Sequence, residues 1–260
     1  MFDRSSEKHM RISGNTEKLP ILHILLSVLK NLNTQKGVLL KRLAFLAIVM
    51  TAFESLSDFF IFKTSFSALI VYWLIYGMVF TLFAVTCHRV ILLGPESVPK
   101  YGLLSISLRE LRFFGWGFVT YFYLSLITFF SMFPMGFFDF DAESNKYQMM
   151  YYSFISIIPG TYLFSRLSIL FPATAVDHRK DMNWAWETTK GNGWRLLILL
   201  GMIPIFIELF LGIFAGISLS MDIALNFIGS ILAAFEIALL SHAFKFLSDE
   251  GVQMKPPISG

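Results

Sequence analysis

Three glutamates stand in the middle of long apolar stretches of this sequence, where ionisable side chains are rare. They are Glu54, Glu208 and Glu236, and Asp58 follows Glu54 by one helical turn. Carboxylates at mid-membrane are costly, and they mark ion pathways and proton relays in transport proteins. A protonated acid that donates a hydrogen bond between helices is the alternative. The four residues therefore indicate an intramembrane polar site, with a transport role and a structural role both open.

Small or polar residues accompany each glutamate at helical spacing. Glu54 shares its face with Ala47, Thr51 and Asp58, Glu208 with Gly201, Gly212 and Gly216, and Glu236 with Gly229, Ala233 and Ala243. Helices in membranes approach one another closely through faces of small residues. The spacing therefore predicts that the three glutamates point into a bundle of helices.

A second group of candidate residues is basic and aromatic. The segment "DHRKDMNWAWETTKGNGWRLL", residues 177–197, carries three tryptophans and seven charged residues. Tryptophan prefers the headgroup level of a bilayer, and lysine and arginine attract anionic phosphates. Contacts with lipid headgroups are predicted at His88, Arg89, Arg166, Trp184, Trp186, Lys190, Trp194 and Arg195. A functional site and a nucleic-acid patch are the other interpretations of the segment, but no known nucleic-acid-binding module accompanies it, and nucleic acid is not an expected partner.

Signatures of catalysis and of metal binding are missing from the sequence. It contains no HExxH, GxSxG or Walker motif, and its five histidines are scattered along the chain. The acidic segment "DFDAESNKY", residues 139–147, lacks the glycine and the terminal glutamate of a calcium loop. Cys87 is the only cysteine, which excludes an intramolecular disulfide. We therefore expect no enzyme activity, no cofactor and no metal site.

The elements that would hold these residues are long apolar helices. The chain of 260 residues is 55% hydrophobic and only 15% charged, which lies outside the range of soluble globular domains. About 20 apolar residues are needed to cross a bilayer as a helix. The predicted spans are residues 43–62, 66–86, 113–138, 150–171, 194–219 and 223–247. The fold class is therefore all-α, a polytopic membrane protein with six transmembrane helices.

Interfacial amphipathic helices are predicted beside these spans. One lies in the N-terminal segment, at residues 19–34, where polar side chains recur along one stripe of a mostly apolar helix. Others are expected in the two cytoplasmic loops, and Asp181 or Asn183 can cap a short helix there that ends near Gly191. The chain then divides into a polar tail, residues 1–18, a single membrane domain, residues 19–247, and a C-terminal tail, residues 248–260.

The distribution of basic residues predicts the orientation of the chain. Of the lysines and arginines in the connections and tails, 18 fall on the side of both termini and only two on the other side. The positive-inside rule then places both termini and both long loops in the cytoplasm. The expected location is the inner membrane of a bacterium, and the expected partner is a bilayer with anionic headgroups on its cytoplasmic side.

Two segments of the chain also resemble a known group of proteins. The sequence "PATAVDHRKDMNWAWETTKGNGWRLL", residues 172–197, resembles the cytoplasmic loop of a large group of bacterial six-helix inner-membrane proteins. The group includes the membrane domain fused to some glycerophosphodiester phosphodiesterases. The segment "HRVILLG", residues 88–94, is similar to the segment after the second span in its stand-alone members. The resemblance implies a six-helix inner-membrane protein, and because 260 residues leave no room for a phosphodiesterase domain, that activity is not expected.

These features favour one function class and keep a second one open. The first is a non-enzymatic envelope or lipid-linked accessory protein of the inner membrane. The alternative is a transporter of small solutes, ions or protons that uses the mid-membrane carboxylates. A protein partner is not identified by the sequence.

Overall fold

Every regular element in the described part of the chain is a helix. The computed structural model describes residues 18–63, 65–99, 106–132 and 158–248, and within them it leaves the side chains of residues 58–63, 128, 131 and 132 undescribed. The predicted all-α class is confirmed for these residues. The polar tail 1–17, most of the C-terminal tail and the acidic connection 139–147 lie outside them.

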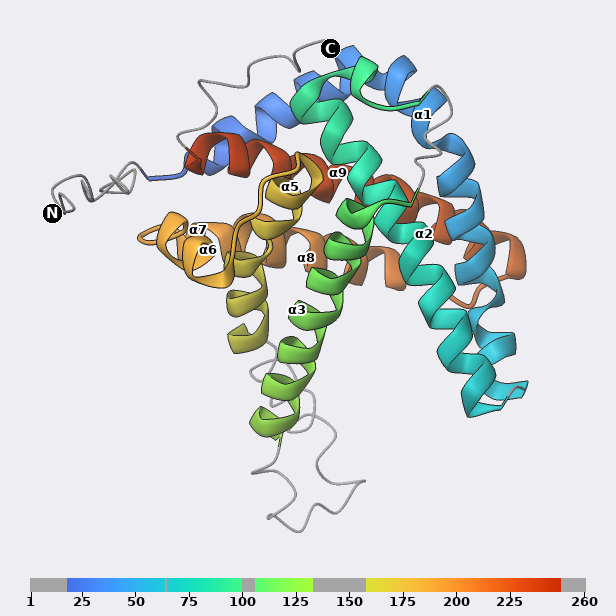
Figure 1. The fold of residues 1–260 in the computed structure, drawn as a ribbon. Helices are drawn as coiled ribbons and strands as arrows, with labels where there is room; N and C mark the ends of the chain where they lie inside the picture. The colour runs from blue at the N-terminus through green and yellow to red at the C-terminus, as the bar shows by residue number, and fades with distance from the viewer. Residues whose placement is uncertain (1–17, 64, 100–105, 133–157, 249–260) are drawn as a thin grey trace, which may run out of the picture.

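The helices follow one another in the order of Figure 1. Their bounds are α1 (Ile21–Lys63), α2 (Phe66–Leu93), α3 (Leu108–Met132), α5 (Leu170–Ala175), α6 (Met182–Thr188), α7 (Gly193–Leu197), α8 (Ile203–Gly212) and α9 (Leu219–Leu247). A short 3-10 helix at Pro95–Ser97 follows α2, and a helical stretch over residues 158–167 precedes α5. Helix α9 crosses behind α2 in the view of Figure 1 and contacts α1, α2, α5 and α8.

Three helices of the described chain are long and apolar enough to cross a membrane. They are Phe66–Leu93, Gly193–Gly212 and Leu219–Leu247, which correspond to the second, fifth and sixth predicted spans. The other three predicted spans, residues 43–62, 113–138 and 150–171, each extend into residues or side chains that are not described. The six-span arrangement therefore stays a prediction.

Helix α1 is continuous where the sequence predicted two elements. The interfacial helix at residues 19–34 and the first span at residues 43–62 join into one helix of 43 residues. The intervening segment contains no proline, and its one glycine, Gly37, has an ordinary helical backbone. Leu39 and Leu43 are buried in this segment, so packing continues along the helix. The predicted break between the two elements is wrong because nothing in the sequence stops the helix there.

The fifth predicted span contains a π-helical segment just before its proline. Residues Ile198–Met202 form this wider turn between α7 and α8, and Pro204 lies in the first turn of α8. A proline cannot donate to the carbonyl one turn earlier, and a π-turn is one way for a helix to accommodate that loss. The helix therefore passes through Pro204 and continues to Glu208.

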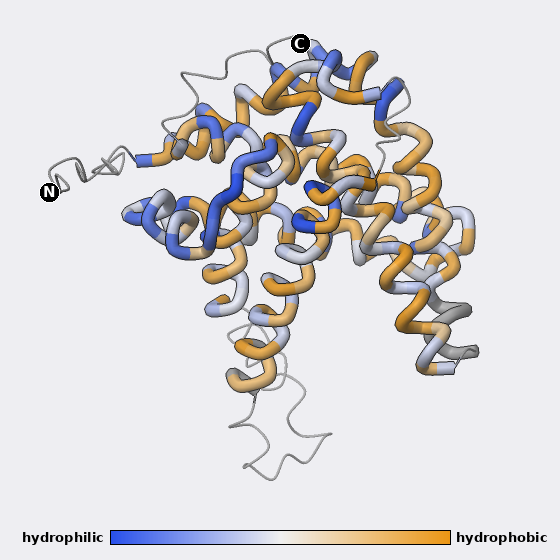
Figure 2. The backbone as a smooth tube through the Cα atoms, in the orientation of Figure 1, coloured by the Kyte–Doolittle hydropathy of each residue, from blue (hydrophilic) through white to orange (hydrophobic). Residues whose placement is uncertain are grey.

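The core lies around α9 and forms two adjoining clusters. One joins the start of α1 to residues 167–199, with Leu19, Val28 and Ile169 fully buried. The other joins the later part of α1 to α2, through residues such as Met50 and Phe83. Both include residues of α9. Figure 2 shows hydrophobic residues along most of the helices, while hydrophilic residues gather in the segment between α5 and α6.

Candidate functional site

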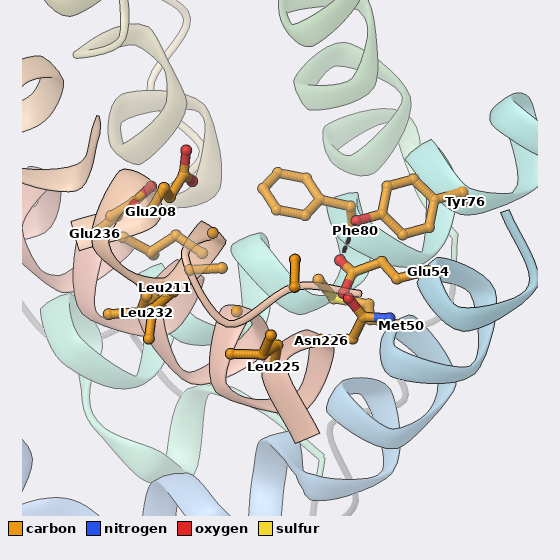
Figure 3. A pocket seen from close by; sticks show the side chains of 15 residues that line it. Met50, Glu54, Tyr76, Phe80, Glu208, Leu211, Leu225, Asn226, Leu232 and Glu236 are labelled. Atoms are coloured by element: carbon orange, nitrogen blue, oxygen red, sulfur yellow. Dashed lines mark hydrogen bonds between the residues drawn. The ribbon is translucent and has the colours of Figure 1, made fainter. Parts of the chain in front are cut away.

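Three of the four predicted carboxylates line one pocket. The pocket has a volume of about 390 Å³, and Glu54, Glu208 and Glu236 all contribute to its wall (Figure 3). Four helices meet there: α1, α2, α8 and α9. The remaining lining residues are Met50, Tyr76, Phe80, Leu211, Gly212, Ala215, Leu225, Asn226, Gly229, Leu232, Ala233 and Ile237. Glu54 is thus brought to the same site as Glu208 and Glu236, which lie 154 and 182 positions further along the chain.

Glu54 lies on one side of the pocket with two uncharged polar partners nearby. The Tyr76 hydroxyl of α2 donates a hydrogen bond of 2.7 Å to Glu54 Oε1. Asn226 of α9 lies beside Glu54 in Figure 3, and its Nδ2 donates to Ser55 Oγ at 3.1 Å. Phe53 contacts the Tyr76 ring at 6.2 Å between centroids and holds it from the α1 side. Glu54 is therefore oriented by a specific hydrogen bond and not only by its place on the helix.

Glu208 and Glu236 lie together on the opposite side of the pocket. Their side chains are adjacent in Figure 3, and their carboxyl groups are near enough to interact electrostatically. Glu236 is half-buried, whereas Glu208 is exposed. Two adjacent carboxylates repel each other, and a proton or a bound cation between them removes that repulsion. This side of the pocket is therefore a place where a positive charge is stabilised.

The small residues that accompany the acids do open space for the pocket. Gly212, Gly229 and Ala233 line it, each on the predicted face of its glutamate. Gly201 of the same series packs elsewhere, against Thr161, where a Cβ atom would come within 2.5 Å of the Thr161 methyl carbon. Asp58 lies one turn after Glu54 in α1, but its side chain is outside the described ones.

A row of polar contacts joins α1 to α9 next to the pocket. Thr51 Oγ1 and Ser230 Oγ are 3.3 Å apart, and Asn226 binds Ser55 one turn further along. Both Thr51 and Ser230 are buried. These contacts fix the register of α1 against α9, and they thereby fix how Glu54 faces Glu236.

Two lining residues with polar groups, Tyr76 and Asn226, were not singled out from the sequence. Asn226 precedes Gly229 by three residues, so it extends the small face of Glu236 by one turn and that spacing would have identified it. Tyr76 carried no such signal, because its apolar ring suits a lipid-facing position as well as a buried one. Its role follows only from the packing of α2 against α1.

None of the predicted headgroup residues lines the pocket, and most of them lie in or next to the loop that contains α6. Asp181 Oδ1 accepts the Trp184 N–H at 2.8 Å and caps α6, and the turn after α6 passes through Gly191 with a φ of 78°. Trp194 is 66% exposed and Trp186 is 42% exposed. Trp184 is half-buried and packs on Phe244 of α9, while Lys190 is exposed. Whether these side chains contact lipid stays a prediction.

This loop holds the start of α1 through main-chain contacts. The Leu19 N–H donates to Asn192 Oδ1 at 2.7 Å, and Arg195 Nη1 donates to the Leu19 carbonyl at 2.7 Å. Leu19 itself is fully buried. We call these three residues the N-terminal clasp. Arg195 therefore uses one of its donors within the protein.

Arg166 is packed inside this region. Its guanidinium lies 3.4 Å from the centre of the Trp186 ring, and its Nε donates to Thr189 Oγ1 at 2.9 Å. A further donor, Nη2, binds the Trp186 carbonyl. Only 6% of Arg166 is exposed. The arginine thus connects the helical stretch 158–167 to α6, and a headgroup could reach it only if this packing opened.

His88 and Arg89 point into the protein as well. His88 is 1% exposed, and its Nδ1 is 2.8 Å from Ser241 Oγ of α9. Arg89 Nη1 donates to the Ala175 carbonyl and to Asp177 Oδ2, each at 3.0 Å. As with Arg166, contact with a lipid phosphate would require these interactions to be replaced.

Arg89 belongs to a charge cluster that the sequence did not predict. Arg109 also binds Asp177 Oδ2, at 3.2 Å, and forms two hydrogen bonds with Glu110 Oε1. Glu110 accepts the Ser107 N–H at 2.9 Å, as in a capping box at the start of α3. Burial acts to raise the pKa of Glu110, but the hydrogen bonds from Ser107 and Arg109 outweigh it, so the pKa lies below its ordinary value. The cluster joins the end of α2, the start of α3 and the turn after α5.

Among the described side chains, no three His, Cys, Asp or Glu residues are close enough together to hold one metal ion. In Figure 3 Glu54 lies apart from Glu208 and Glu236, so the pocket has two acidic sides, and apolar residues make up most of the rest of its lining.

Comparisons with known proteins found no relative: no family model, no curated protein and no solved structure matches this chain. The resemblance to the six-helix inner-membrane group stays an expectation from the two quoted segments.

Proposed function

We propose that this protein is a membrane carrier that binds a cation, protons included, in the pocket between α1, α2, α8 and α9. One observation carries the proposal: Glu54, Glu208 and Glu236, each in the middle of an apolar segment, line the same pocket. Acids used only to join pairs of helices would not need a shared cavity. A cation that enters this pocket meets carboxylates on both sides.

The electrostatics of the site favour a ligand with positive charge. A carboxylate inside a bilayer is stabilised by a counter-charge because the surrounding medium solvates it poorly. In the described chain no lysine or arginine lines the pocket. Among the described residues, the pocket acids therefore lack a basic partner, which favours a proton or an external cation as their counter-charge.

The proposed threading of the chain has six spans with both termini in the cytoplasm, in the inner membrane of a bacterium. Three apolar helices and the 18 to 2 distribution of basic residues support it. The pocket acids then lie between the two membrane surfaces, where a carrier needs its binding site.

Flux through liposomes that contain the purified full-length protein tests the proposal. The probes are protons, K⁺ and a series of alkylammonium ions, driven by an inside-negative potential. We expect uptake of at least one of them, and a reduction of about tenfold or more in Glu208→Gln and in Glu236→Gln, because an amide cannot stabilise a cation as a carboxylate does. Glu96→Gln is the matched control, since Glu96 is exposed and lies outside the pocket.

The second candidate function, an accessory protein bound to anionic lipid, is favoured by the exposed Trp186, Trp194 and Lys190 of the α6 loop. Their chemistry suits a headgroup layer. The same preparation separates the two functions. Two results together would contradict the carrier and support the accessory protein. The folded wild-type protein would show no cation flux, and it would co-purify with anionic lipid that the variants Lys190→Ala and Trp194→Ala lose.

A further inference from the structure

The pocket is larger than an inorganic cation needs. Its volume of about 390 Å³ compares with roughly 30 Å³ for one water molecule in the liquid. It falls in the range of roughly 300–1,000 Å³ that is typical of sites for small organic molecules. A bare metal ion in such a space would lack the close shell of about six or more oxygen ligands that hard cations require. The size therefore indicates an organic ligand.

The middle of the pocket is apolar. Leu211, Leu225 and Leu232 line it and are labelled in Figure 3, and further apolar side chains come from α1, α2 and α9, namely Met50, Phe80, Ala233 and Ile237. Burial of hydrocarbon against such surfaces contributes about 25 cal/mol per Å². The body of the ligand is therefore expected to be aliphatic.

The charged groups stand at two separate places in the wall. Glu208 and Glu236 lie together on one side, and Glu54 lies on the other with Tyr76 and Asn226 (Figure 3). A cation between the two adjacent carboxyl groups relieves the repulsion between them on that side. The hydrogen bond from Tyr76 stabilises a negative charge on Glu54. The rings of Tyr76 and Phe80 add aromatic faces that attract an ammonium group.

We propose that the ligand of the pocket is an aliphatic diamine-like dication, with one ammonium group at Glu208 and Glu236, the second at Glu54, and the hydrocarbon chain across the apolar middle. The proposal rests on the proposed carrier function and specifies its substrate class. A monoamine fills only one of the two acidic places and leaves the other without a counter-charge. An inorganic cation leaves the apolar lining unused.

Equilibrium binding to the full-length protein in lipid nanodiscs tests the proposal by calorimetry. The probes are α,ω-diaminoalkanes of four to eight carbons, the n-alkylamine and the α,ω-diol of each length, and KCl. Affinity should pass through an optimum of chain length, and the best diamine should bind roughly tenfold to a hundredfold more tightly than the monoamine of equal length, as expected for one additional charged hydrogen bond. The diols should not bind.

Variants of the pocket test which glutamate binds each ammonium group of the diamine. In Glu54→Gln the best diamine should bind no better than the matched monoamine, while the affinity for the monoamine stays as in wild type. Glu96→Gln should behave as wild type. If Glu54→Gln does not yield a monodisperse protein, the ligand series on the wild type decides alone, because the diamine preference and its length optimum are measured there.

The outcomes also separate this inference from the carrier proposal. Two results would overturn the diamine ligand and leave the carrier proposal intact. One is equal affinity for the diamine and the monoamine. The other is a flux of protons or K⁺ that depends on the glutamates, without any binding of a diamine. No binding and no flux of any cation would overturn both.

Discussion

Glu110 shows how a buried charge is stabilised in this protein. Its side chain is fully buried, yet it accepts hydrogen bonds from Ser107 and from the Arg109 guanidinium. Position matters too, because Glu110 lies in the first turn of α3, where the helix dipole favours a negative charge. These partners hold its pKa below the ordinary value of 4.5 although burial opposes them. The folded structure therefore stabilises the ionised form of Glu110.

Glu110→Gln should destabilise the protein at neutral pH and remove part of its acid sensitivity. The pKa of Glu110 is lower in the folded protein than its ordinary value of 4.5. Its ionised form therefore stabilises the folded state fully at pH values above 4.5, and this stabilisation is lost as the pH falls through the pKa of the folded state. We expect a loss of about 1–3 kcal/mol at pH 7, measured as a lower apparent Tm in detergent, and a smaller difference from wild type at pH 4 and below. Glu187→Gln is the control, because its exposed contact with Lys190 at 3.8 Å should contribute little. A constant difference at all pH values would show that the charge of Glu110 is unimportant.

At the scale of elements, the N-terminal clasp determines where α1 begins. Both main-chain groups of Leu19 are hydrogen-bonded, one to Asn192 at the start of α7 and the other to Arg195 within α7. Neither contact is visible in the sequence, because the partners are more than 170 positions apart. The clasp makes the amphipathic start of α1 and the α6 loop move as one unit.

Asn192→Ala should loosen the start of α1 without unfolding the helices around the pocket. The Leu19 N–H loses its acceptor, so amide exchange at residues 19–24 should become roughly twofold to tenfold faster by mass spectrometry. Asn192→Asp keeps an oxygen acceptor and should stay close to wild type. If the alanine variant exchanges at wild-type rates, the hydrogen bond does not hold the helix end.

At the scale of the whole molecule, the threading depends on charge more than on packing. In the predicted six-span threading, 18 basic residues fall on one side and two on the other, and an odd number of spans would divide the larger group between the two sides. The first span is the weakest, because Glu54 and Asp58 both interrupt it.

Reporter fusions should therefore fall on opposite sides of the membrane. A fusion after Asn145 should be outside and a fusion after Gly260 should be cytoplasmic, as measured with alkaline phosphatase and a fluorescent protein. Fusions at both positions on one side of the membrane would contradict the six-span threading.

The elements themselves were largely predictable from local patterns. Apolar length predicted the helices α2 and α9 and the combined helix from Gly193 to Gly212, because a backbone in lipid must satisfy its own hydrogen bonds. The cap at Asp181 followed from a polar residue at a helix start. Boundaries were less predictable: α1 continues through the expected break, and α2 extends to Leu93, seven residues beyond the predicted span.

What the sequence determined by itself was the class of fold and the identity of three unusual carboxylates, because both depend on composition and on helical spacing. The tertiary structure alone decided that those carboxylates share one pocket, with Glu54 held by Tyr76 on one side and Glu208 beside Glu236 on the other. It also decided that His88 and Arg166 are enclosed by protein. Spacing along one helix fixes which residues share a face, but only the packing of α1, α2, α8 and α9 determines which faces meet.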